Sequence, residues 1–357
     1  MSIFSEMAEL EHEQLVFCRN DEVGLRAIIA VHSTALGPAL GGCRLYNYAN
    51  EADAVRDVLR LSRGMTYKAA VAGLDLGGGK SVIIGDPAIK SEELFRAFGR
   101  FVESLHGRYI TAEDMNTTVE DMNRIRRETR YVTGASTDAG GSGDPSPVTA
   151  WGVFHGIRAC LEVVYGSPDM TGRTVAIQGL GAVGIHLARF LHEAGARLLV
   201  TDISERKLEH AVREFGSTII DGDDFYGVEC DVLAPCAIGG IINAATIPRI
   251  RAPIIAGAAN NQLDDEDRDG ALLEQAGIVY APDYVINAGG LINVAAELEG
   301  RPAQKAMNDA ASIFDTVKRI INLSRAGGIT TTAASNQVAR ERIDAVSRLR
   351  RFHLPSR

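Results

Sequence analysis

The sequence predicts an α/β protein of two domains, and three observations carry that prediction. Short apolar stretches of strand length alternate with longer stretches whose apolar residues recur at helical spacing. A glycine- and proline-rich stretch, residues 133–149, interrupts this alternation. A glycine turn at 179–184 directly follows one of the apolar stretches. The length of 357 residues also suits about two domains.

The first half of the chain reads as an α/β unit. Runs of β-branched and apolar residues predict strands at 25–31, 81–84 and 109–111. Helical spacing of apolar residues predicts helices at 52–65, 92–105 and 118–129. The last of these helices has Glu120 and Asp121 in its first turn and basic residues later, which suits the helix dipole.

The second half shows the same alternation. Residues 133–149 contain six helix-breaking residues, namely Gly134, Gly140, Gly141, Gly143, Pro145 and Pro147. Beyond them we expect helices at 153–164 and 185–194, and strands at 174–178, 198–201, 232–234, 254–257 and 278–281. Repeated strand–helix alternation predicts a parallel sheet with helices on both faces.

These patterns set the expected domain bounds. The first domain covers 1–140 and the second covers 145–325. From Gln304 onward the chain is mostly helical, with a break at Gly327 and Gly328 and a basic stretch at 340–351 that suits a solvated helix face. We expect the C-terminal helix, 330–357, to join the first domain.

Composition excludes several classes of partner. Lys and Arg number 37 against 46 Asp and Glu, and a net charge of −9 gives no basic footprint for nucleic acid or an anionic membrane. No run of 18 apolar residues occurs, and the N-terminal stretch carries Glu6, Glu9, Glu11 and Glu13 instead of a basic region. We therefore expect a soluble cytoplasmic protein.

The cysteines and histidines predict no metal site. The five cysteines form no Cys-x-x-Cys pair, and they read as reduced thiols of the core: Cys18, Cys43, Cys160, Cys230 and Cys236. The eight histidines include none at metal-ligand spacing.

The glycine turn has the context of a dinucleotide-binding motif. A predicted strand precedes Gly179-Leu180-Gly181-Ala182-Val183-Gly184, a helix follows, and Asp202 ends the next strand. Gly179 permits the turn, Gly181 lets the backbone approach a pyrophosphate, and Gly184 allows close packing of helix on strand. Asp202 would accept hydrogen bonds from a ribose, which favours NAD over NADP, although Arg206 and Lys207 lie close by in sequence. The second domain is thus a predicted Rossmann domain.

A second glycine cluster, Gly77-Gly78-Gly79-Lys80, ends in a lysine twelve residues after Lys68. It is not a P-loop, because Leu74 occupies the position that needs glycine and the following residues read as a strand. We interpret the glycines as a loop along which a ligand can lie close to the backbone. Desolvation and a second ammonium would lower the pKa of Lys80 so that it can act as a base, while Lys68 stays charged and binds a carboxylate. The alternative is two ordinary surface lysines.

Six segments together resemble one known family. They are 36–42, 65–68, 77–80, 111–114, 258–263 and 287–294, and they resemble the glutamate/leucine/phenylalanine/valine dehydrogenases over nearly the whole chain. Within that family the similarity is greatest to the leucine dehydrogenases. The resemblance implies a first domain for substrate binding and oligomerisation, a Rossmann domain, and an active site in the cleft between them.

The resemblance also implies an activity and its residues. The activity is NAD-dependent, reversible oxidative deamination of an L-amino acid to a 2-oxo acid and ammonium. Lys68 would bind the substrate carboxylate, Lys80 would act as the base, and Asp114 would share the acid–base work. Matching positions imply nicotinamide and ribose contacts at Thr149, Ala237, Asn260 and Asn287, and a substrate contact at Asn261. Asp114 also has an alternative interpretation as the cap of the helix that follows it.

The resemblance implies an apolar substrate. It places Leu40, Gly41, Gly42, Ala112, Leu291 and Val294 around the substrate. Apolar side chains would leave a second carboxylate buried without a partner, which disfavours glutamate. Leu291 and Asn116 depart from the leucine pattern, and Asp114-Met115-Asn116-Thr117 resembles the phenylalanine and tryptophan enzymes. The choice between branched-chain and aromatic substrates therefore stays open.

Other functions remain to be separated. A non-catalytic sensor would bind NAD without turnover, but Lys68, Lys80 and Asp114 are all present. A 2-hydroxy-acid dehydrogenase would need a histidine base with an acidic partner and an arginine clamp, and no such set stands out. Members of the family form homo-oligomers, so we expect an octamer or a dimer.

Overall fold

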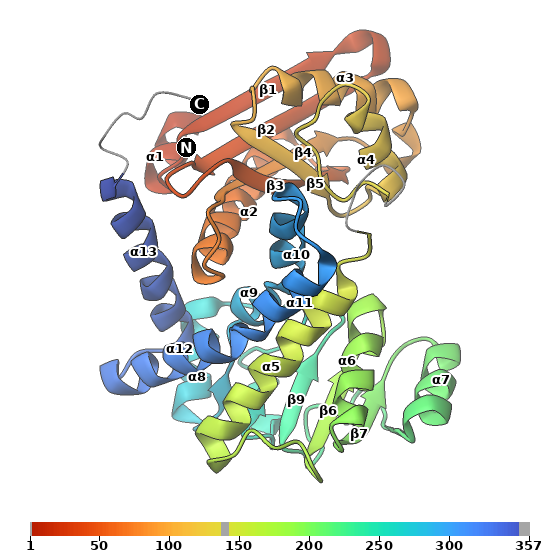
Figure 1. Ribbon diagram of the computed structural model, residues 1–357, viewed down its shortest axis with the longest axis vertical. Coiled ribbons are helices and arrows are strands. Elements are labelled where there is room, and N and C mark those ends of the chain that lie inside the picture. Colours follow the sequence, from red (N-terminus) through yellow and green to blue (C-terminus); the bar gives the residue numbers. More distant parts are fainter. Residues whose placement is uncertain (1, 137–142, 350–357) are drawn as a thin grey trace. The chain divides into compact units, whose positions relative to one another are not determined.

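The computed structural model describes residues 2–136 and 143–349 (Figure 1). The chain forms two compact units. Unit 1 comprises Met1–Asp144, Glu297–Gly300 and Ala339–Arg357, and unit 2 comprises Pro145–Ala296 and Arg301–Val338. Each unit has a β-sheet covered by helices, so the predicted α/β class is confirmed. Residues 137–142 of the predicted loop and the end of the basic stretch lie outside the described residues.

Unit 1 is built on a mixed five-stranded sheet with the order β1-β2-β4-β3-β5. β2 is antiparallel to β1 and β4, whereas β3 is parallel to β4 and β5. The strands are β1 (Gln14–Asn20), β2 (Leu25–Ser33), β3 (Ala39–Tyr46), β4 (Gly77–Ile84) and β5 (Tyr109–Glu113). The sequence pattern did not predict β1 or β3, and β4 begins four residues before its predicted start at 81.

Helices cover both faces of this sheet. They are α1 (Ile3–Glu9), α2 (Glu51–Val71), α3 (Glu92–Glu103) and α4 (Val119–Arg126), with 3₁₀ turns η1 (Asp21–Val23) and η2 (Pro87–Ile89). The side chains of Asn50, Ser91 and Thr118 cap α2, α3 and α4 by accepting backbone N–H groups. One core cluster joins α2 to β2 and β4, and a second joins α3 and α4 to the other face (Figure 1).

Unit 2 contains the predicted parallel sheet, with the order β11-β10-β9-β6-β7-β8. Its strands are β6 (Thr174–Gln178), β7 (Arg197–Thr201), β8 (Thr218–Ile219), β9 (Val232–Pro235), β10 (Ile254–Ile255) and β11 (Val279–Tyr280). β6 is central, so the turn that follows it lies in the middle of the carboxyl edge of the sheet.

The remaining helices accompany this sheet or extend to the C-terminus. They are α5 (Ser146–Tyr165), α6 (Ala182–Glu193), α7 (Glu205–Phe215), α8 (Glu266–Gln275), α9 (Asp283–Ile286), α10 (Gly289–Leu298), α11 (Ala303–Ala311), α12 (Ile313–Gly327) and α13 (Thr331–Leu349), with the 3₁₀ turn η4 (Ile247–Arg249). α5 starts seven residues before its predicted start, because Pro147 is tolerated in the first turn of a helix. The predicted break is confirmed: α12 ends at Gly327, and Gly328 is left-handed.

The C-terminal part of α13 belongs to unit 1 and packs on the end of α2. Arg340 Nε donates to Tyr67 Oη at 3.0 Å, and Arg342 donates to the carbonyls of Gly73 and Leu74 and to Asp75. These carbonyls follow the C-terminal end of α2, where a cation is favoured. The basic stretch therefore includes residues that bind the chain and not only solvent.

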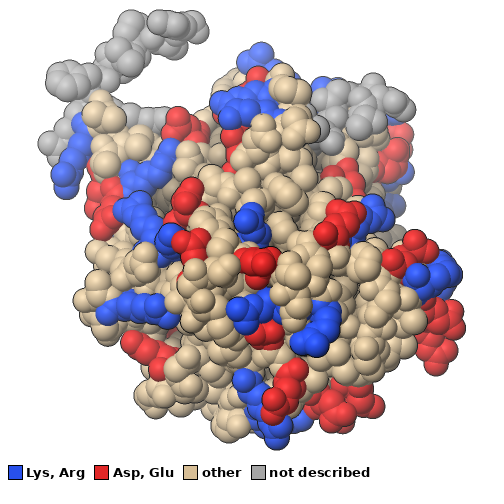
Figure 2. All heavy atoms as spheres, turned by 60° about the horizontal axis from the view of Figure 1, so that its bottom comes forward, with Lys and Arg blue, Asp and Glu red and all other residues tan. Residues whose placement is uncertain are grey.

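All five cysteines are free, but they are not all core residues. Cys18, Cys43 and Cys160 are buried, whereas Cys230 and Cys236 are half-buried. Within the described ranges, no helix combines the length and the apolarity that crossing a membrane demands. On the face in Figure 2, lysines and arginines are interspersed with aspartates and glutamates, and neither sign forms an extended area among the residues drawn in colour.

Two histidines connect unit 1 strands to α2: His32 of β2 is buried, and His12, two residues before β1, is half-buried. His12 Nε2 lies 3.0 Å from Leu59 O and 2.9 Å from Ser62 Oγ. His32 Nδ1 lies 2.7 Å from Thr66 Oγ1, and the two rings meet edge to face at 4.8 Å. Burial lowers the pKa of His12 from 6.5 to about 4, and burial followed by the charges of His12 and Arg63 lowers that of His32 to about 3.

This pair predicts a loss of stability in acid. The unfolded chain takes up protons on these rings below pH 6.5, while the folded chain resists until the pH approaches the folded pKa values, so stability is full above 6.5 and falls toward pH 3. For His32 we expect a loss of roughly 2 to 3 kcal/mol by about pH 4.5, because one pKa unit corresponds to about 1.4 kcal/mol.

The measurement is the free energy of urea unfolding at about pH 4.5 and above pH 6.5, for the wild type and for His32→Gln. The variant should lose less stability on acidification than the wild type does. An equal loss in the two proteins would show that other groups carry the acid sensitivity.

Candidate active site

The candidate residues of β4 lie on the sheet face that α2 covers. Side chains alternate between the two faces of a strand. Val82 of β4 packs in the cluster with Val58 and Leu59 of α2, whereas Ile83 packs in the cluster on the opposite face. Lys80 lies two residues before Val82 and therefore shares the face of α2.

The same alternation places the candidate residues of β3 and β5. Cys43 of β3 and Tyr109 of β5 belong to the cluster on the far face. Their neighbours therefore face α2, namely Leu40, Gly42, Arg44, Ile110 and Ala112. Gly41 is buried on the other face of β3, where its neighbour across the sheet is Thr111. Parallel pairing puts Gly42 opposite Ala112, so the candidate residues of three strands form one row.

Lys80 and Asp114 form an ion pair on this side of the sheet. Lys80 Nζ lies 2.7 Å from Asp114 Oδ1, and the Lys80 side chain is only 7% exposed. Asp114 directly follows β5 and is 23% exposed. Burial pushes the pKa of Asp114 upward, but Lys80 and Arg44 outweigh burial and hold that pKa below its ordinary value. The interpretation of Lys80 as a surface lysine is therefore wrong.

Lys68 approaches from the helix above the sheet. It is half-buried in the last turn of α2. Two residues earlier, Thr66 packs against Gly78 of β4, which lies two residues before Lys80. A Cβ on Gly78 would lie 2.1 Å from Thr66 Oγ1 and 2.2 Å from Thr66 N. The absence of a side chain at 78 thus sets the distance between α2 and β4.

Two interpretations from the sequence need correction here. The glycines 77–79 form the start of β4 and not a loop, because their missing side chains admit Thr66 on one face and the Tyr109 ring on the other. Asp114 does not cap the following helix. Thr118 does so, through a reciprocal capping box with Asp121.

Asn116 and Cys43 have structural roles beside the site. Asn116 has a φ of 60°, a left-handed conformation that asparagine tolerates better than most residues, and its Nδ2 donates to Leu45 O at 3.0 Å. The Cys43 carbonyl accepts from Thr117 Oγ1 at 2.9 Å, and burial raises the pKa of the Cys43 thiol to about 12.

Two charged residues beside the Lys80–Asp114 pair, Arg44 and Asp57, were not predicted from the sequence. Arg44 Nε donates to Asp114 Oδ2 at 3.0 Å, and Arg44 Nη1 donates to Asp57 Oδ2 at 2.9 Å. The sequence held part of the information, because Arg44 lies two residues after Gly42 and residues two apart on a strand share a face. The strand itself was not predicted, so that spacing could not be used.

The apolar candidates differ in exposure. Leu40 is 1% exposed on β3, and Ala112 is half-buried on β5. In unit 2, Leu291 is buried and Val294 is half-buried, three residues apart on α10 and hence on one side of that helix. Asn261 is exposed and has a φ of 50°.

The glycine turn of unit 2 fits an anionic dinucleotide. Gly179 has a φ of 94°, and Gly181 is the N-cap of α6 with no side-chain hydrogen bond to the cap. A Cβ on Gly181 would meet nothing within 4 Å, so space is open beside the free N–H groups of Ala182 and Val183. A Cβ on Gly184 would lie 2.0 Å from Gly179 O, which shows how closely α6 approaches the turn.

Asp202 holds this turn from the end of β7. Its carboxylate accepts from Leu180 N at 2.7 Å and from Ser204 N at 2.8 Å, and Lys207 Nζ lies 3.6 Å away. Burial alone would raise the pKa of Asp202. The two N–H groups and Lys207 outweigh burial and hold that pKa below its ordinary value. The residue expected to meet a ribose is therefore ionised and fixed.

The remaining cofactor candidates also lie in unit 2. Asn287 is 4% exposed, and its Nδ2 donates to Asn260 Oδ1 at 2.7 Å and to Ala258 O at 3.1 Å. Ala237 contacts the turn, since its Cβ would lie 2.7 Å from a Cβ on Gly179. Thr149 lies on α5 and donates to Pro145 O at 3.0 Å.

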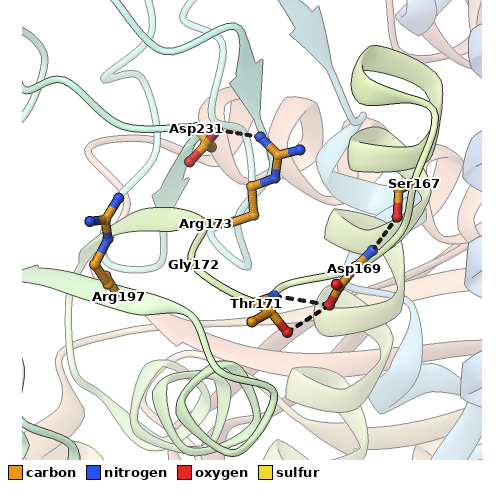
Figure 3. A pocket seen from close by; sticks show the side chains of 7 residues that line it. All are labelled: Ser167, Asp169, Thr171, Gly172, Arg173, Arg197 and Asp231. Carbon is orange, nitrogen blue, oxygen red and sulfur yellow. Dashed lines mark hydrogen bonds and ion pairs between the residues drawn. The ribbon is translucent and has the colours of Figure 1, made fainter.

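A polar cavity of about 390 Å³ lies elsewhere on unit 2 (Figure 3). Its lining includes Arg173, which precedes β6, and Arg197, the first residue of β7. It therefore lies at the amino ends of these strands, away from the glycine turn at the carboxyl end of β6. Arg173 there pairs with Asp231 at 3.0 Å. None of the candidate site residues lines this cavity.

Comparisons with known proteins match both halves of the chain. Residues 12–131 match the family model "Glu/Leu/Phe/Val dehydrogenase, dimerisation domain", and residues 140–205 and 200–345 match "Glutamate/Leucine/Phenylalanine/Valine dehydrogenase". The leucine dehydrogenase of Geobacillus stearothermophilus is 53% identical over 98% of this chain and 95% of its own. The L-tryptophan dehydrogenase of Nostoc punctiforme is 48% identical over 96% of this chain and 97% of its own. The crystal structure of L-tryptophan dehydrogenase from the same organism superposes with a TM-score of 0.88 at 46% identity, covering 97% of this chain and 99% of that one.

Proposed function

The chain belongs to the glutamate/leucine/phenylalanine/valine dehydrogenase family, and we propose that it catalyses the NAD-dependent, reversible oxidative deamination of an apolar L-amino acid of the leucine or branched-chain type. The products are the 2-oxo acid and ammonium. The comparisons confirm the family relationship that the motifs predicted. Amino acid dehydrogenase activity with a nicotinamide cofactor follows from membership of this family. The individual substrate, NAD itself and the residue roles are the proposal.

One observation carries the chemical part of the proposal. Lys80 and Asp114 pair at 2.7 Å in a buried position, on the sheet face beneath the helix that bears Lys68. A lysine held in contact with an ionised carboxylate can pass a proton to and from a nearby water or amine. A second cation on the adjacent helix suits the carboxylate of the same amino acid.

Each residue then has a defined task. Lys68 binds the α-carboxylate and so orients the α-carbon. Lys80 passes a proton to Asp114 and, in its neutral form, accepts a proton from the water that attacks the substrate imine, while Asp114 also holds Lys80 in position. A bound nicotinamide supplies the acceptor for the hydride that leaves the α-carbon. The family resemblance also assigns Asn261 to the substrate.

The dinucleotide is assigned to unit 2. The open N-terminus of α6 suits the pyrophosphate, with its turn formed by the residues 179–184. Asp202 suits the ribose hydroxyls of NAD and would repel a 2'-phosphate, which favours NAD over NADP. Lys207 is already engaged by Asp202 and so offsets this repulsion less than a free cation would. Thr149, Ala237, Asn260 and Asn287 are assigned to the nicotinamide and its ribose.

We assign the substrate side chain to the four apolar residues that the family resemblance implies, namely Leu40, Ala112, Leu291 and Val294. A carboxylate placed among them would lose its hydration without gaining a partner. An aromatic amino acid is the alternative, supported by the Asp114-Met115-Asn116-Thr117 pattern and by the similarity to a tryptophan dehydrogenase. A non-catalytic NAD sensor is the alternative of another class.

Assembly and location follow the same reasoning. The match to a dimerisation domain at residues 12–131 supports a homo-oligomer, for which we propose a dimer or an octamer. The five free thiols suit a reducing compartment, which supports a cytoplasmic location.

The proposal is tested by initial rates of nucleotide reduction with a panel of substrates. The panel contains leucine, isoleucine, valine, phenylalanine, tryptophan, glutamate and lactate, each with NAD and with NADP. We expect the highest kcat/KM with a branched-chain amino acid and NAD, and a value for glutamate at least about 10³-fold lower, because burying an unpaired carboxylate costs several kcal/mol. Highest kcat/KM with phenylalanine or tryptophan would favour the aromatic alternative. Binding of NAD without turnover of any substrate would favour the sensor.

A further inference from the structure

Behind the Lys80–Asp114 pair, a chain of polar contacts connects four parts of unit 1. Asp114 Oδ2, the oxygen that does not contact Lys80, accepts from Arg44 Nε at 3.0 Å. Arg44 Nη1 reaches Asp57 Oδ2 at 2.9 Å, and the same oxygen accepts from Tyr48 Oη at 2.5 Å. Arg44 lies on β3, Asp57 on α2, and Tyr48 between them.

The Arg44 side chain is more restrained than that of a typical surface arginine. Its side chain is 19% exposed and contacts two carboxylates through different nitrogens, Nε and Nη1. A guanidinium is a planar fork with fixed directions, so binding two acceptors at once restricts its rotation. Asp57 in turn is restrained by Tyr48, whose own pKa is raised by burial and by the Asp57 carboxylate.

The contact with Asp57 also connects Arg44 to the helix of Lys68. Asp57 and Lys68 are eleven residues apart on α2, which is close to three helical turns, so they lie on the same side of that helix. Through its two carboxylate partners, Arg44 therefore restrains both Asp114 beside Lys80 and the helix that carries Lys68.

We propose that Arg44 is the positioning residue of this active site, which holds one oxygen of Asp114 so that the other stays directed at Lys80, with Asp57 and Tyr48 fixing Arg44 in turn. This inference rests on the proposed function for its kinetic consequences, but the geometry of the Asp114 carboxylate can be tested apart from any turnover.

The charges around Asp114 predict how its pKa should respond to the loss of Arg44. Two cations contact Asp114, namely Lys80 and Arg44, whereas the nearby buried groups of Cys43 and Tyr109 are neutral and lie in the cluster on the far face of the sheet. Burial disfavours the carboxylate, so the two cations keep it ionised. Removing Arg44 leaves Lys80 as the one remaining cation of that set, and the pKa of Asp114 should rise.

The test compares Arg44→Met and Arg44→Lys with the wild type. For Arg44→Met we expect kcat to fall about 10- to 100-fold with KM for the amino acid changed less than about threefold, because Arg44 contacts no substrate in this proposal. The acidic limb of the kcat/KM profile should move up by about one pH unit, since a more basic Asp114 loses its charge at higher pH. Arg44→Lys should recover part of kcat, because an ammonium can meet one carboxylate but lacks the fork that meets both.

Arg96→Met is the matched control. Arg96 lies on α3 and pairs with Glu128 at 2.6 Å and Glu92 at 3.5 Å, on the sheet face opposite the site. Its loss removes a doubly paired arginine without touching Asp114. We therefore expect kcat and KM within about twofold of the wild type and an acidic limb of the kcat/KM profile at the wild-type pH. Should Arg44→Met fail to fold by urea unfolding and gel filtration, Asp57→Asn weakens the restraint on Arg44 in a nearly isosteric way and should show a smaller shift in the same direction.

A second readout needs no activity. Infrared titration of protein labelled with ¹³C-carboxyl aspartate, with Asp114→Asn to identify the band, reports the Asp114 carboxyl directly. An upward shift of this titration in Arg44→Met supports the inference even if no amino acid is oxidised, which would overturn the proposed function alone. A folded Arg44→Met with unchanged infrared titration and unchanged acidic limb would overturn the inference.

Discussion

Lys80→Met is expected to lower kcat for amino acid oxidation by about 10³-fold or more, while the protein stays folded and still binds NAD. General acid–base groups contribute about 10²- to 10⁴-fold to rates, and Lys80 is buried in contact with Asp114. Methionine has a similar length and fills the buried volume. Asp114 keeps Arg44 as a partner, so the substitution does not leave an unpaired buried carboxylate.

The measurement is the steady-state rate over a range of amino acid concentrations, with NAD binding followed separately by calorimetry. Lys318→Met is the matched control, because Lys318 also forms a short ion pair, with Glu162 at 2.6 Å, but lies on α12. Its kcat should equal that of the wild type within about twofold. Retention of most of the turnover by Lys80→Met would show that another group is the base.

Lys68→Met separates the two lysines. If Lys68 binds the substrate carboxylate, KM for the amino acid should rise by at least about tenfold, since a charged hydrogen bond contributes roughly 1.5 to 3 kcal/mol. A fall in kcat alone, with KM unchanged, would argue that the two roles are reversed.

Gly78→Ala is expected to have the second large effect, on both folding and activity. The added Cβ would lie 2.1 Å from Thr66 Oγ1, 2.2 Å from Thr66 N and 2.5 Å from Ser62 O. Two of these three atoms belong to the backbone of α2, so no side-chain rotation can relieve the contact and the helix must move off the strand. We expect a loss of about 2 to 4 kcal/mol in the free energy of unfolding, the upper range for overpacking a well-packed interior.

Activity should fall further than stability alone explains. Lys68 and Lys80 are each two residues from the Thr66–Gly78 contact, so moving α2 changes the distance between the two cations. A displacement of about 1 Å at a reacting centre can lower the rate about 10²-fold. The measurements are urea unfolding and kcat/KM below the unfolding transition.

Gly64→Ala provides the control for this substitution. Gly64 is an exposed residue of the same helix, and a Cβ there would meet nothing within 4 Å. Alanine should stabilise the helix by about 0.5 to 1 kcal/mol and leave kcat/KM unchanged. Unchanged unfolding and activity in Gly78→Ala would contradict the close approach of α2 to β4.

The sequence by itself determined the α/β class, the parallel sheet of unit 2 and the position of its glycine turn. These features depend on interactions between near neighbours: apolar periodicity, a strand ending in glycine, and an acidic residue at the end of the next strand. Motifs at 65–68, 77–80 and 111–114 also pointed to Lys68, Lys80 and Asp114 before any geometry was known. The family relationship rests on the same residues.

Only the tertiary structure decided how those residues act on one another. Glycines 77–79 read as a loop because glycine is a poor strand former, yet they form a strand because Thr66 and Tyr109 pack against the two faces they leave open. Arg44 meets Asp114 across 70 positions of the chain, and His12 meets Ser62 across 50. Such contacts depend on strand order and on the register of a helix against a sheet, and neither is encoded in any short stretch of residues.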